Sequence, residues 1–261
     1  MIGPGPHDRL FRDAVASYDA HRAGYPPALI DAIVARCGLT PKSALLDLGC
    51  GPGTLARAFA GCVGHVTGLD PEPAMIAEAR RLDPGHADDY AVGSDVDLVH
   101  LDRRFDAVTI GRALHWMDAE TIAARLGAVL RLGGWVAIVS SPHRDAPGNL
   151  WWRAVRQVVL AFDPSDGARA TLPDVGPPEA LFAGHGFAPP ILVETRAERA
   201  LTVADVLGLL HSIPGTTPQA LGARRTAFER AIAATIEPFL HDGKVTEYMA
   251  PRALLFERRA P

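Results

Sequence analysis

The stretch Leu45-Leu46-Asp47-Leu48-Gly49-Cys50-Gly51-Pro52-Gly53-Thr54 decides the fold of this chain. A short apolar run that ends in glycine is typical of a buried strand, and the residues after the glycines begin a helix. Glycine is needed where the backbone turns sharply or where a ligand must approach it closely. The stretch therefore predicts a strand, a glycine turn and a helix, with a ligand lying close to the backbone of the turn.

The spacing of the glycines argues against a dinucleotide as that ligand. A dinucleotide-binding turn follows the pattern Gly-x-Gly-x-x-Gly and seats a pyrophosphate on the helix N-terminus. Position 54 is Thr, so the third glycine, Gly53, comes one residue early. An acid, Asp47, also stands two residues before the first glycine, where its negative charge does not suit a pyrophosphate. An NAD-dependent oxidoreductase is therefore a disfavoured alternative.

Strands and helices alternate around this turn. Apolar runs predict buried strands at 43–49, 63–70, 105–111 and 135–141. Apolar spacing predicts helices after Thr54, after Pro73 and after Asp118, which can cap its helix, and Gly61 suits the end of the first of them. Such alternation with short connections predicts an α/β fold with a mainly parallel sheet. Ligands of such sheets bind at the carboxyl ends of the strands, near the switch in strand order.

The second half of the chain departs from this rhythm. The stretch 142–186 holds one helix and then many Pro and Gly residues, which predicts an insertion over the binding edge rather than a separate domain. A long amphipathic helix is expected after Thr217-Pro218, and the last strand within 245–257. We therefore interpret 1–261 as a single domain.

Charge, apolar runs and cysteine spacing argue against several classes of protein. The net charge is −4 and the pI about 6.2, which argues against a protein that binds nucleic acid by neutralising phosphates. No apolar run approaches the ~18 residues of a spanning helix, and no signal peptide is evident. Three cysteines without paired spacing fit a reducing cytoplasm and predict no metal site.

The glycine turn resembles motif I of the class I S-adenosylmethionine-dependent methyltransferases, whose signature is Asp/Glu-x-Gly-x-Gly-x-Gly. Asp47, Gly49, Gly51 and Gly53 match all four marked positions. Asp70 follows the second predicted strand, where an acid can accept hydrogen bonds from both hydroxyls of a ribose. Because the same geometry serves NAD, Asp70 indicates a nucleoside without choosing between the two cofactors.

The resemblance implies a Rossmann-like sheet with helices on both faces and an antiparallel last strand, and S-adenosylmethionine as the cofactor. It places Met75 against the adenine, although plain core packing is an equal alternative. It places an acid and the following amide at the adenine edge. Ser94 occupies the usual position of that acid, and we favour Asp95 with the Val96 amide. The backbone at Gly111 would meet the methionine end of the cofactor.

Two further segments are similar to the small-molecule, trans-aconitate methyltransferase-like group. The first, Tyr18-Asp-Ala-His-Arg22-Ala-Gly-Tyr25-Pro26, resembles a lid segment of that group, with Ala23 in place of a proline. By resemblance, Arg22 would pair with the carboxylate of the cofactor and Tyr18 would cover the site, so that 1–40 forms an N-terminal helical lid. The alternative is an ordinary solvated helix.

The second segment is Gly111-Arg-Ala-Leu-His115-Trp116, which follows the fourth predicted strand. His115 is a candidate general base, because an unperturbed imidazole titrates near neutral pH. The alternative is that His115 only orders the loop and that Trp116 lines the pocket. His143 and His211 are candidates for the substrate cavity and equally for the surface.

The residues and the resemblance together predict a cytoplasmic S-adenosylmethionine-dependent methyltransferase. It would transfer a methyl group to an O, N or C atom of a small organic molecule, without nucleic-acid or membrane partners, as a monomer or homodimer. The alternative is a non-catalytic protein that binds the cofactor.

Overall fold

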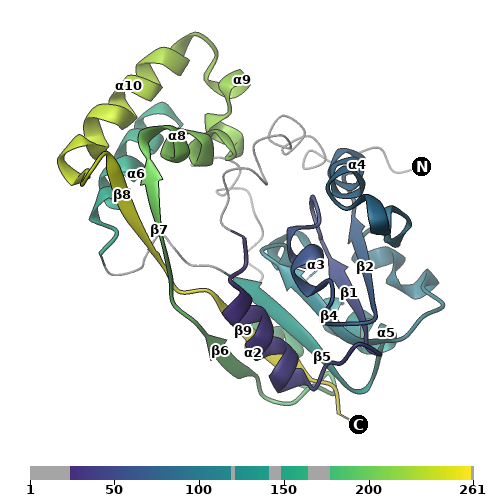
Figure 1. The fold of residues 1–261 in the computed structure, drawn as a ribbon. Helices are drawn as coiled ribbons and strands as arrows, with labels where there is room; N and C mark the ends of the chain where they lie inside the picture. Colours follow the sequence, from purple (N-terminus) through teal and green to yellow (C-terminus); the bar gives the residue numbers. More distant parts are fainter. Residues whose placement is uncertain (1–23, 119–120, 141–147, 164–176, 260–261) are drawn as a thin grey trace. The chain divides into compact units, whose positions relative to one another are not determined.

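The computed structural model describes residues 24–118, 121–140, 148–163 and 177–259, which divide into two compact units (Figure 1). The sheet unit takes its described residues from 24–141, 173–195 and 251–261. The helical unit takes them from 142–172 and 196–250. From the sequence, we interpreted the chain as one domain with an insertion at 142–186. The helical unit combines part of that stretch with 196–250, and the interpretation of the chain as a single domain stays a prediction.

A seven-stranded sheet forms the centre of the sheet unit, in the order β3-β2-β1-β4-β5-β9-β6. The strands are β1 (Ala44–Leu48), β2 (His65–Asp70), β3 (Tyr90–Val92), β4 (Phe105–Gly111), β5 (Leu130–Ser140), β6 (Ile191–Glu194) and β9 (Arg252–Glu257). Strand β9 runs antiparallel to both of its neighbours, and the other pairs are parallel. The mainly parallel sheet with an antiparallel last strand is therefore confirmed. The order reverses between β1 and β4, which places a switch point beside the glycine turn.

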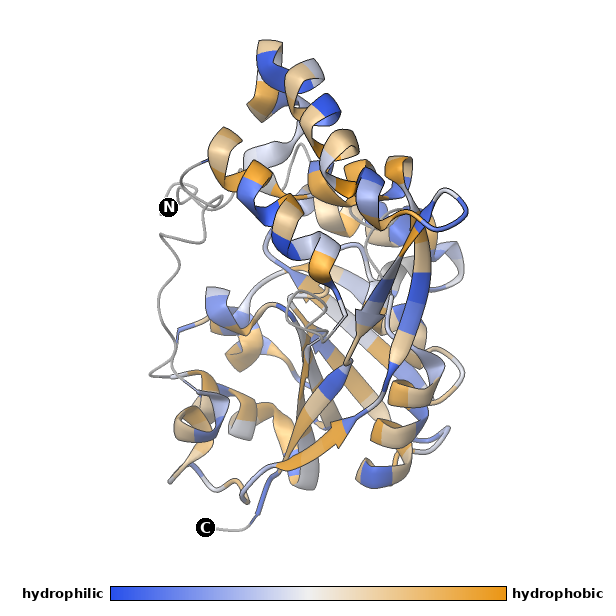
Figure 2. Cartoon of the chain, turned by 90° about the vertical axis from the view of Figure 1, so that its left-hand side faces the viewer, coloured by the Kyte–Doolittle hydropathy of each residue, from blue (hydrophilic) through white to orange (hydrophobic). Residues whose placement is uncertain are grey.

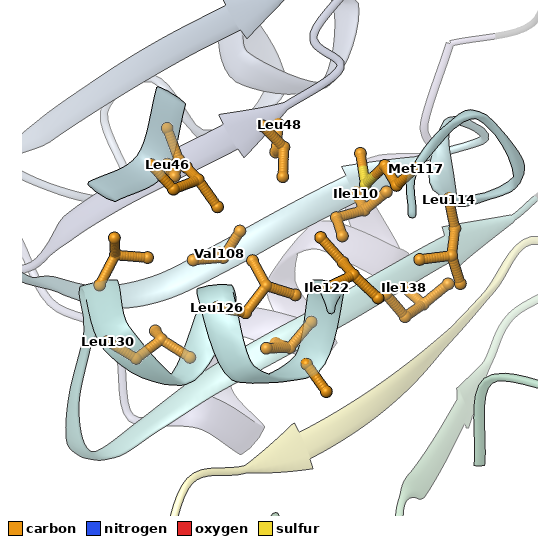
Figure 3. Packing of buried hydrophobic residues seen from close by; sticks show 14 of the residues in the cluster. Leu46, Leu48, Val108, Ile110, Leu114, Met117, Ile122, Leu126, Leu130 and Ile138 are labelled. Atoms are coloured by element: carbon orange, nitrogen blue, oxygen red, sulfur yellow. The ribbon is translucent and has the colours of Figure 1, made fainter. Parts of the chain in front are cut away.

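Helices cover both faces of this sheet, as predicted. They are α2 (Pro27–Cys37), α3 (Thr54–Phe59), α4 (Pro73–Leu82), α5 (Ile122–Val129) and α7 (Pro178–Phe182). Alternate residues of each strand point to opposite faces. Leu46 and Val108 therefore pack toward α5, whereas Leu45 and Ala107 pack toward α2 and α3. Figure 3 shows the first of these clusters, in which α5 lays Ile122 and Leu126 onto the strands.

The helix predicted after Asp118 begins about one turn later in the structure. Asp118 was expected to cap a helix, but α5 begins at Ile122, after Thr121. The carbonyl of Asp118 accepts from the amide of Ile122 at 2.9 Å, and its carboxylate accepts from the hydroxyl of Thr121 at 2.5 Å. Asp118 thus stabilises the turn that precedes the helix.

The helical unit pairs two antiparallel strands, β7 (Ala197–Thr202) and β8 (Lys244–Met249), with three main helices. These are α6 (Leu150–Phe162), α8 (Val203–His211) and α10 (Arg225–Ile236). In Figure 2 these helices carry hydrophobic and hydrophilic residues along their length, and their apolar residues form one buried cluster.

Two expectations about this unit were wrong in detail. The long helix after Thr217-Pro218 is broken: α9 (Pro218–Leu221) ends at Gly222, whose φ of 52° and ψ of −127° are not helical. The last strand expected within 245–257 is two strands, β8 and β9, because Ala250-Pro251 separates them. They belong to different units.

Candidate active site

The glycine turn between β1 and α3 is anchored to the end of β2. Gly49, Gly51 and Gly53 have φ values of 70°, 55° and 78°, a region that favours glycine. The amide of Gly51 donates to Asp70 Oδ2 at 2.8 Å, and the amide of Glu72 donates to Asp70 Oδ1 at 2.9 Å. Two backbone donors therefore fix both oxygens of one carboxylate beside the turn, and each oxygen keeps further acceptor capacity.

The three glycines differ in what surrounds them. A Cβ at Gly49 would lie 2.5 Å from the Cβ of Ala113, and a Cβ at Gly53 would lie 2.9 Å from the Tyr90 hydroxyl. A Cβ at Gly51 would meet no atom of the described residues within 4 Å. Gly49 and Gly53 are therefore required for packing, whereas Gly51 faces open space. Gly51 is the glycine at which a ligand can approach the backbone.

Tyr90 supports this turn and was not identified from the sequence. Its ring is 2% exposed, and its hydroxyl donates to Asp83 Oδ2 at 3.0 Å. A Cβ at Gly68 of β2 would also lie 2.6 Å from the ring. The ring thus occupies the space that Gly53 and Gly68 leave. An aromatic residue at the start of β3 was the available signal, but its contact could not be read from spacing.

Asp70 is largely buried, and burial raises the pKa of its carboxyl above the ordinary value, with a smaller upward contribution from the charge of Glu72. The amides of Glu72 and Gly51 oppose this by stabilising the charged form. An anchored carboxylate at the carboxyl end of β2 suits a ligand that offers two adjacent hydroxyl donors. A nucleoside ribose is such a ligand.

Asp47 lies inside the sheet unit, 1% exposed, in β1. Thr109 in β4 is its partner in the strand register, and the Thr109 hydroxyl donates to Asp47 Oδ1 at 2.8 Å. Asp47 Oδ2 is buried and accepts no hydrogen bond from the described residues. Burial raises the pKa of Asp47 to about 7 and the charge of Asp70 adds to this, while Thr109 and the amide of Ala56 oppose it. Sequence reasoning found Asp47 but not Thr109.

The segment predicted to meet the adenine edge is held by contacts within the fold, and the assignment of Asp95 and the Val96 amide stays a prediction. Asp95 begins a 3-10 helix (Asp95–His100), and its carboxylate forms an ion pair with Arg125 of α5. The Val96 side chain is 53% exposed. The Ser94 hydroxyl donates to Asp97 Oδ2 at 3.2 Å. Because Asp95 is engaged within the fold, Ser94, at the position where the family has its acid, is the more accessible of the two.

The loop after β4 packs against the glycine turn. Ala113 contacts Gly49, and a short 3-10 helix (Leu114–Trp116) follows it. The His115 and Trp116 rings are both half-buried, with centroids 5.1 Å apart and planes tilted by 46°. The segment that carries His115 therefore lies beside the turn, with Ala113 and Met117 next to Gly49.

The remaining predicted residues fall into three groups. Met75 of α4 is 4% exposed. At Gly111 a Cβ would lie 2.5 Å from the Tyr25 hydroxyl, so this glycine admits the segment that precedes α2. Tyr18, Arg22 and His143 lie outside the described residues.

His211 belongs to the helical unit. It is 8% exposed, and its ring nitrogens face the Thr216 carbonyl at 2.7 Å and the Glu229 carboxylate at 3.1 Å. The histidine is thus bound within its own unit rather than lying on the surface.

Over the described ranges, no group of three or more His, Cys, Asp or Glu residues is placed to hold a metal ion. Within the same part of the chain, no helix has both the length and the apolar character needed to cross a bilayer.

Several known proteins are similar to part of this chain. Residues 46–138 match the family model described as a methyltransferase domain. An uncharacterized methyltransferase of Mycobacterium tuberculosis is 30% identical over 166 residues, which cover 63% of this chain and 64% of that protein. A trans-aconitate 2-methyltransferase of Enterobacter is 29% identical over 146 residues, or 55% of this chain and 56% of that protein. The chain thus spans less than two thirds of these relatives' lengths.

Solved structures share the fold at low sequence identity. The cyclopropane synthase MmaA2 of Mycobacterium tuberculosis superposes with a TM-score of 0.54 at 16% identity, covering 98% of this chain and all of that one. The matched residues 46–138 include the end of β1, the glycine turn, Asp70 and β4. Residues 46–138 therefore match a methyltransferase domain, and the chain shares its fold with this solved structure.

Proposed function

We propose that this protein transfers a methyl group from S-adenosylmethionine to a small organic molecule. The observation that carries the proposal is the pair formed by Gly51 and Asp70. An open glycine backbone lies beside a carboxylate that is fixed by two amides, at the switch point of a parallel sheet. These residues fit a nucleoside with free ribose hydroxyls.

Several residues would hold the cofactor. Asp70 would accept from the ribose hydroxyls and Gly51 would allow the nucleoside to approach the backbone. Met75 and the segment from Ser94 to Val96 would meet the adenine, with Ser94 as the more accessible polar side chain. Gly111 would lie toward the methionine end, and Tyr18 and Arg22 would close the site. Asp47 would support the glycine turn from the interior of the sheet unit, because its carboxylate is buried beside Thr109.

The bound cofactor supplies a methyl group that is already activated on a sulfonium. The chain's own residues therefore need to position the acceptor in line with that methyl, exclude water and, for a hydroxyl or carbon acceptor, remove a proton. His115 is the candidate for proton removal, since it lies in the loop that contacts the turn. If the acceptor arrives ionised, His115 has a positioning role instead.

Cys50 lies within the turn but has no role as a nucleophile. Cys50 is 6% exposed, and its thiol faces the Gly51 carbonyl, with Sγ 3.5 Å from the oxygen. Burial, with the nearby charges of Asp47 and Asp70, raises the pKa of the thiol well above its ordinary value. The thiolate that nucleophilic chemistry needs is therefore disfavoured here.

A small organic acceptor is the favoured substrate class. The relative from Enterobacter is named for methylation of trans-aconitate. The net charge of −4 offers no general attraction to a polyanionic nucleic acid. A non-catalytic cofactor-binding protein is the competing function, because the same turn and acid would serve it equally well.

Turnover separates these two functions. The protein is incubated with S-adenosylmethionine and fractions of a bacterial small-metabolite extract, and S-adenosylhomocysteine is quantified by mass spectrometry. We expect at least one fraction to release S-adenosylhomocysteine in step with a product that is heavier by one CH₂. Cofactor binding without turnover in any fraction would favour the binding protein.

A further inference from the structure

Arg112 directly follows β4 and has an unusual backbone conformation. Its φ is 60°, in the left-handed region that non-glycine residues rarely adopt. Among the described residues, Asp242 is the one other non-glycine case, and it lies in the tight turn between His241 and Lys244. Arg112 lies in no hairpin, and its amide donates to the Val139 carbonyl of β5 at 3.2 Å. Such conformations persist where the surrounding structure enforces them, often at functional sites.

The guanidinium of Arg112 lies against the aromatic ring of Tyr25. The Arg112 Cζ lies over the Tyr25 ring, 5.4 Å from its centroid, which is within the range of a cation–π interaction. A guanidinium that lies over a ring keeps its N–H donors in its own plane, at its edge. Those donors match the two oxygens of a carboxylate.

Gly111 makes room for this arrangement. Its φ is not positive, so no unusual conformation requires glycine here. A Cβ at this position would instead lie 2.5 Å from the Tyr25 hydroxyl and 2.9 Å from Leu55 Cδ2. Glycine is therefore required so that Tyr25 can lie beneath Arg112. Gly111, Arg112 and Tyr25 form one arrangement, which we call the arginine platform.

We propose that the arginine platform binds a carboxylate at the carboxyl end of β4. The proposal rests on the proposed function, which supplies two sources of that group. One is the amino-acid end of the cofactor, and the other is an acidic methyl acceptor. The sequence resemblance assigns the cofactor carboxylate to Arg22 and gives Arg112 no role. Arg112 lies three residues before His115 in the loop after β4, so a group bound by Arg112 would be held near the candidate base.

Calorimetry with two matched ligands tests whether the platform binds the carboxylate of the cofactor. S-adenosylhomocysteine and 5′-methylthioadenosine share the adenosine and the thioether, but only the first carries a carboxylate. If the platform binds the cofactor carboxylate, Arg112→Gln raises the Kd of S-adenosylhomocysteine at least 10-fold and leaves that of 5′-methylthioadenosine unchanged. An equal loss for both ligands would overturn the proposal, because it would indicate a general disturbance of the site.

A second titration tests whether the platform binds the carboxylate of the methyl acceptor. Malonate and trans-aconitate are titrated into protein that is saturated with S-adenosylhomocysteine. If the platform binds an acceptor carboxylate, at least one probe binds the wild type at least 10-fold more tightly than Arg112→Gln, while the Kd of S-adenosylhomocysteine is unchanged. If the variant alters neither S-adenosylhomocysteine affinity nor the binding of either probe, the proposal is wrong.

Matched variants keep the result specific. Arg104→Gln makes the same substitution at an exposed arginine just before β4 and should behave as the wild type. Tyr25→Phe keeps the ring and should retain binding. Tyr25→Leu should weaken binding in the same titration that Arg112→Gln affects. A wild type that binds neither adenosine ligand would refute the proposed function itself, which is a different outcome from failure of the platform.

Discussion

The backbone amide of Gly51 donates to the carboxylate of Asp70 at 2.8 Å, across 19 residues of sequence. The acid that ends β2 therefore holds the turn that follows β1. Because the amide of Glu72 fixes the other oxygen, the open glycine and the carboxylate keep one relative position. A site held in this way has little ordering cost to meet when a ligand binds.

The glycines of the turn should separate binding from stability. Gly51→Ala adds a methyl group into open space, so we expect S-adenosylhomocysteine affinity to fall at least 10-fold. Its stability cost should be only about 1 kcal/mol, from the left-handed backbone. Gly53→Ala meets the Tyr90 hydroxyl and should lower the free energy of unfolding by roughly 1–3 kcal/mol. Urea unfolding and calorimetry on both variants measure this. The opposite ranking would contradict the packing account.

Tyr90 should support the turn through its ring more than through its hydroxyl. Tyr90→Phe removes the hydrogen bond to Asp83 and should cost about 1 kcal/mol of stability, with cofactor affinity nearly retained. Tyr90→Ala leaves the space beneath Gly53 empty and should cost roughly 3–5 kcal/mol. Thermal and urea unfolding check both values. Equal effects of Phe and Ala would place the contribution in the hydroxyl instead.

Asp47 predicts a pH dependence of stability. Its pKa is raised from 3.8 to about 7 in the folded chain, so the folded state binds the extra proton between these two values. The free energy of unfolding should therefore fall as the pH rises from about 4 to 7, by up to about 4 kcal/mol, and level off above pH 7.

Asp47→Asn should remove this dependence, because the amide carries no charge and can still accept from Thr109. We expect the variant to be more stable than the wild type at pH 8 and to show a flatter profile from pH 4 to 7. Urea unfolding at each pH gives the profile, and Asp31→Asn, at an exposed position of α2, is the control. A wild-type profile retained in Asp47→Asn would show that other groups titrate.

His115 distinguishes a base from a positioning role. As a general base, His115→Ala should lower kcat about 10²-fold or more at nearly unchanged cofactor affinity, and one deprotonation between pH 5 and 8 should vanish from the rate profile. As a positioning residue, His115→Asn should keep most of kcat and mainly raise KM. A variant with full kcat and the wild-type pH profile would remove the base assignment.

The sequence predicted the parts of the site that depend on local pattern. Glycine spacing located the turn, and the apolar runs located β1, β2 and β4. The run at 105–111 matches β4, and Gly61 lies just past α3. These features are decided within a few residues of chain, so a single sequence reveals them.

Contacts between distant segments could not be predicted in this way. Gly49 and Gly53 are required because Ala113 and Tyr90 pack against them, and both of these residues lie far along the chain. The ion pair that engages Asp95 comes from Arg125, 30 residues later. Likewise, the assignment of β8 and β9 to different units depends on tertiary packing that periodicity does not record.

Titration calorimetry with S-adenosylhomocysteine and NAD tests the central claim most directly, on the wild type and on Asp70→Ala. We expect a micromolar Kd for S-adenosylhomocysteine, no measurable binding of NAD, and a loss of roughly 1.5–3 kcal/mol of binding free energy in Asp70→Ala, the value of hydrogen bonds to a charged group. A wild type that binds NAD, or an Asp70→Ala variant with unchanged S-adenosylhomocysteine affinity, would contradict it.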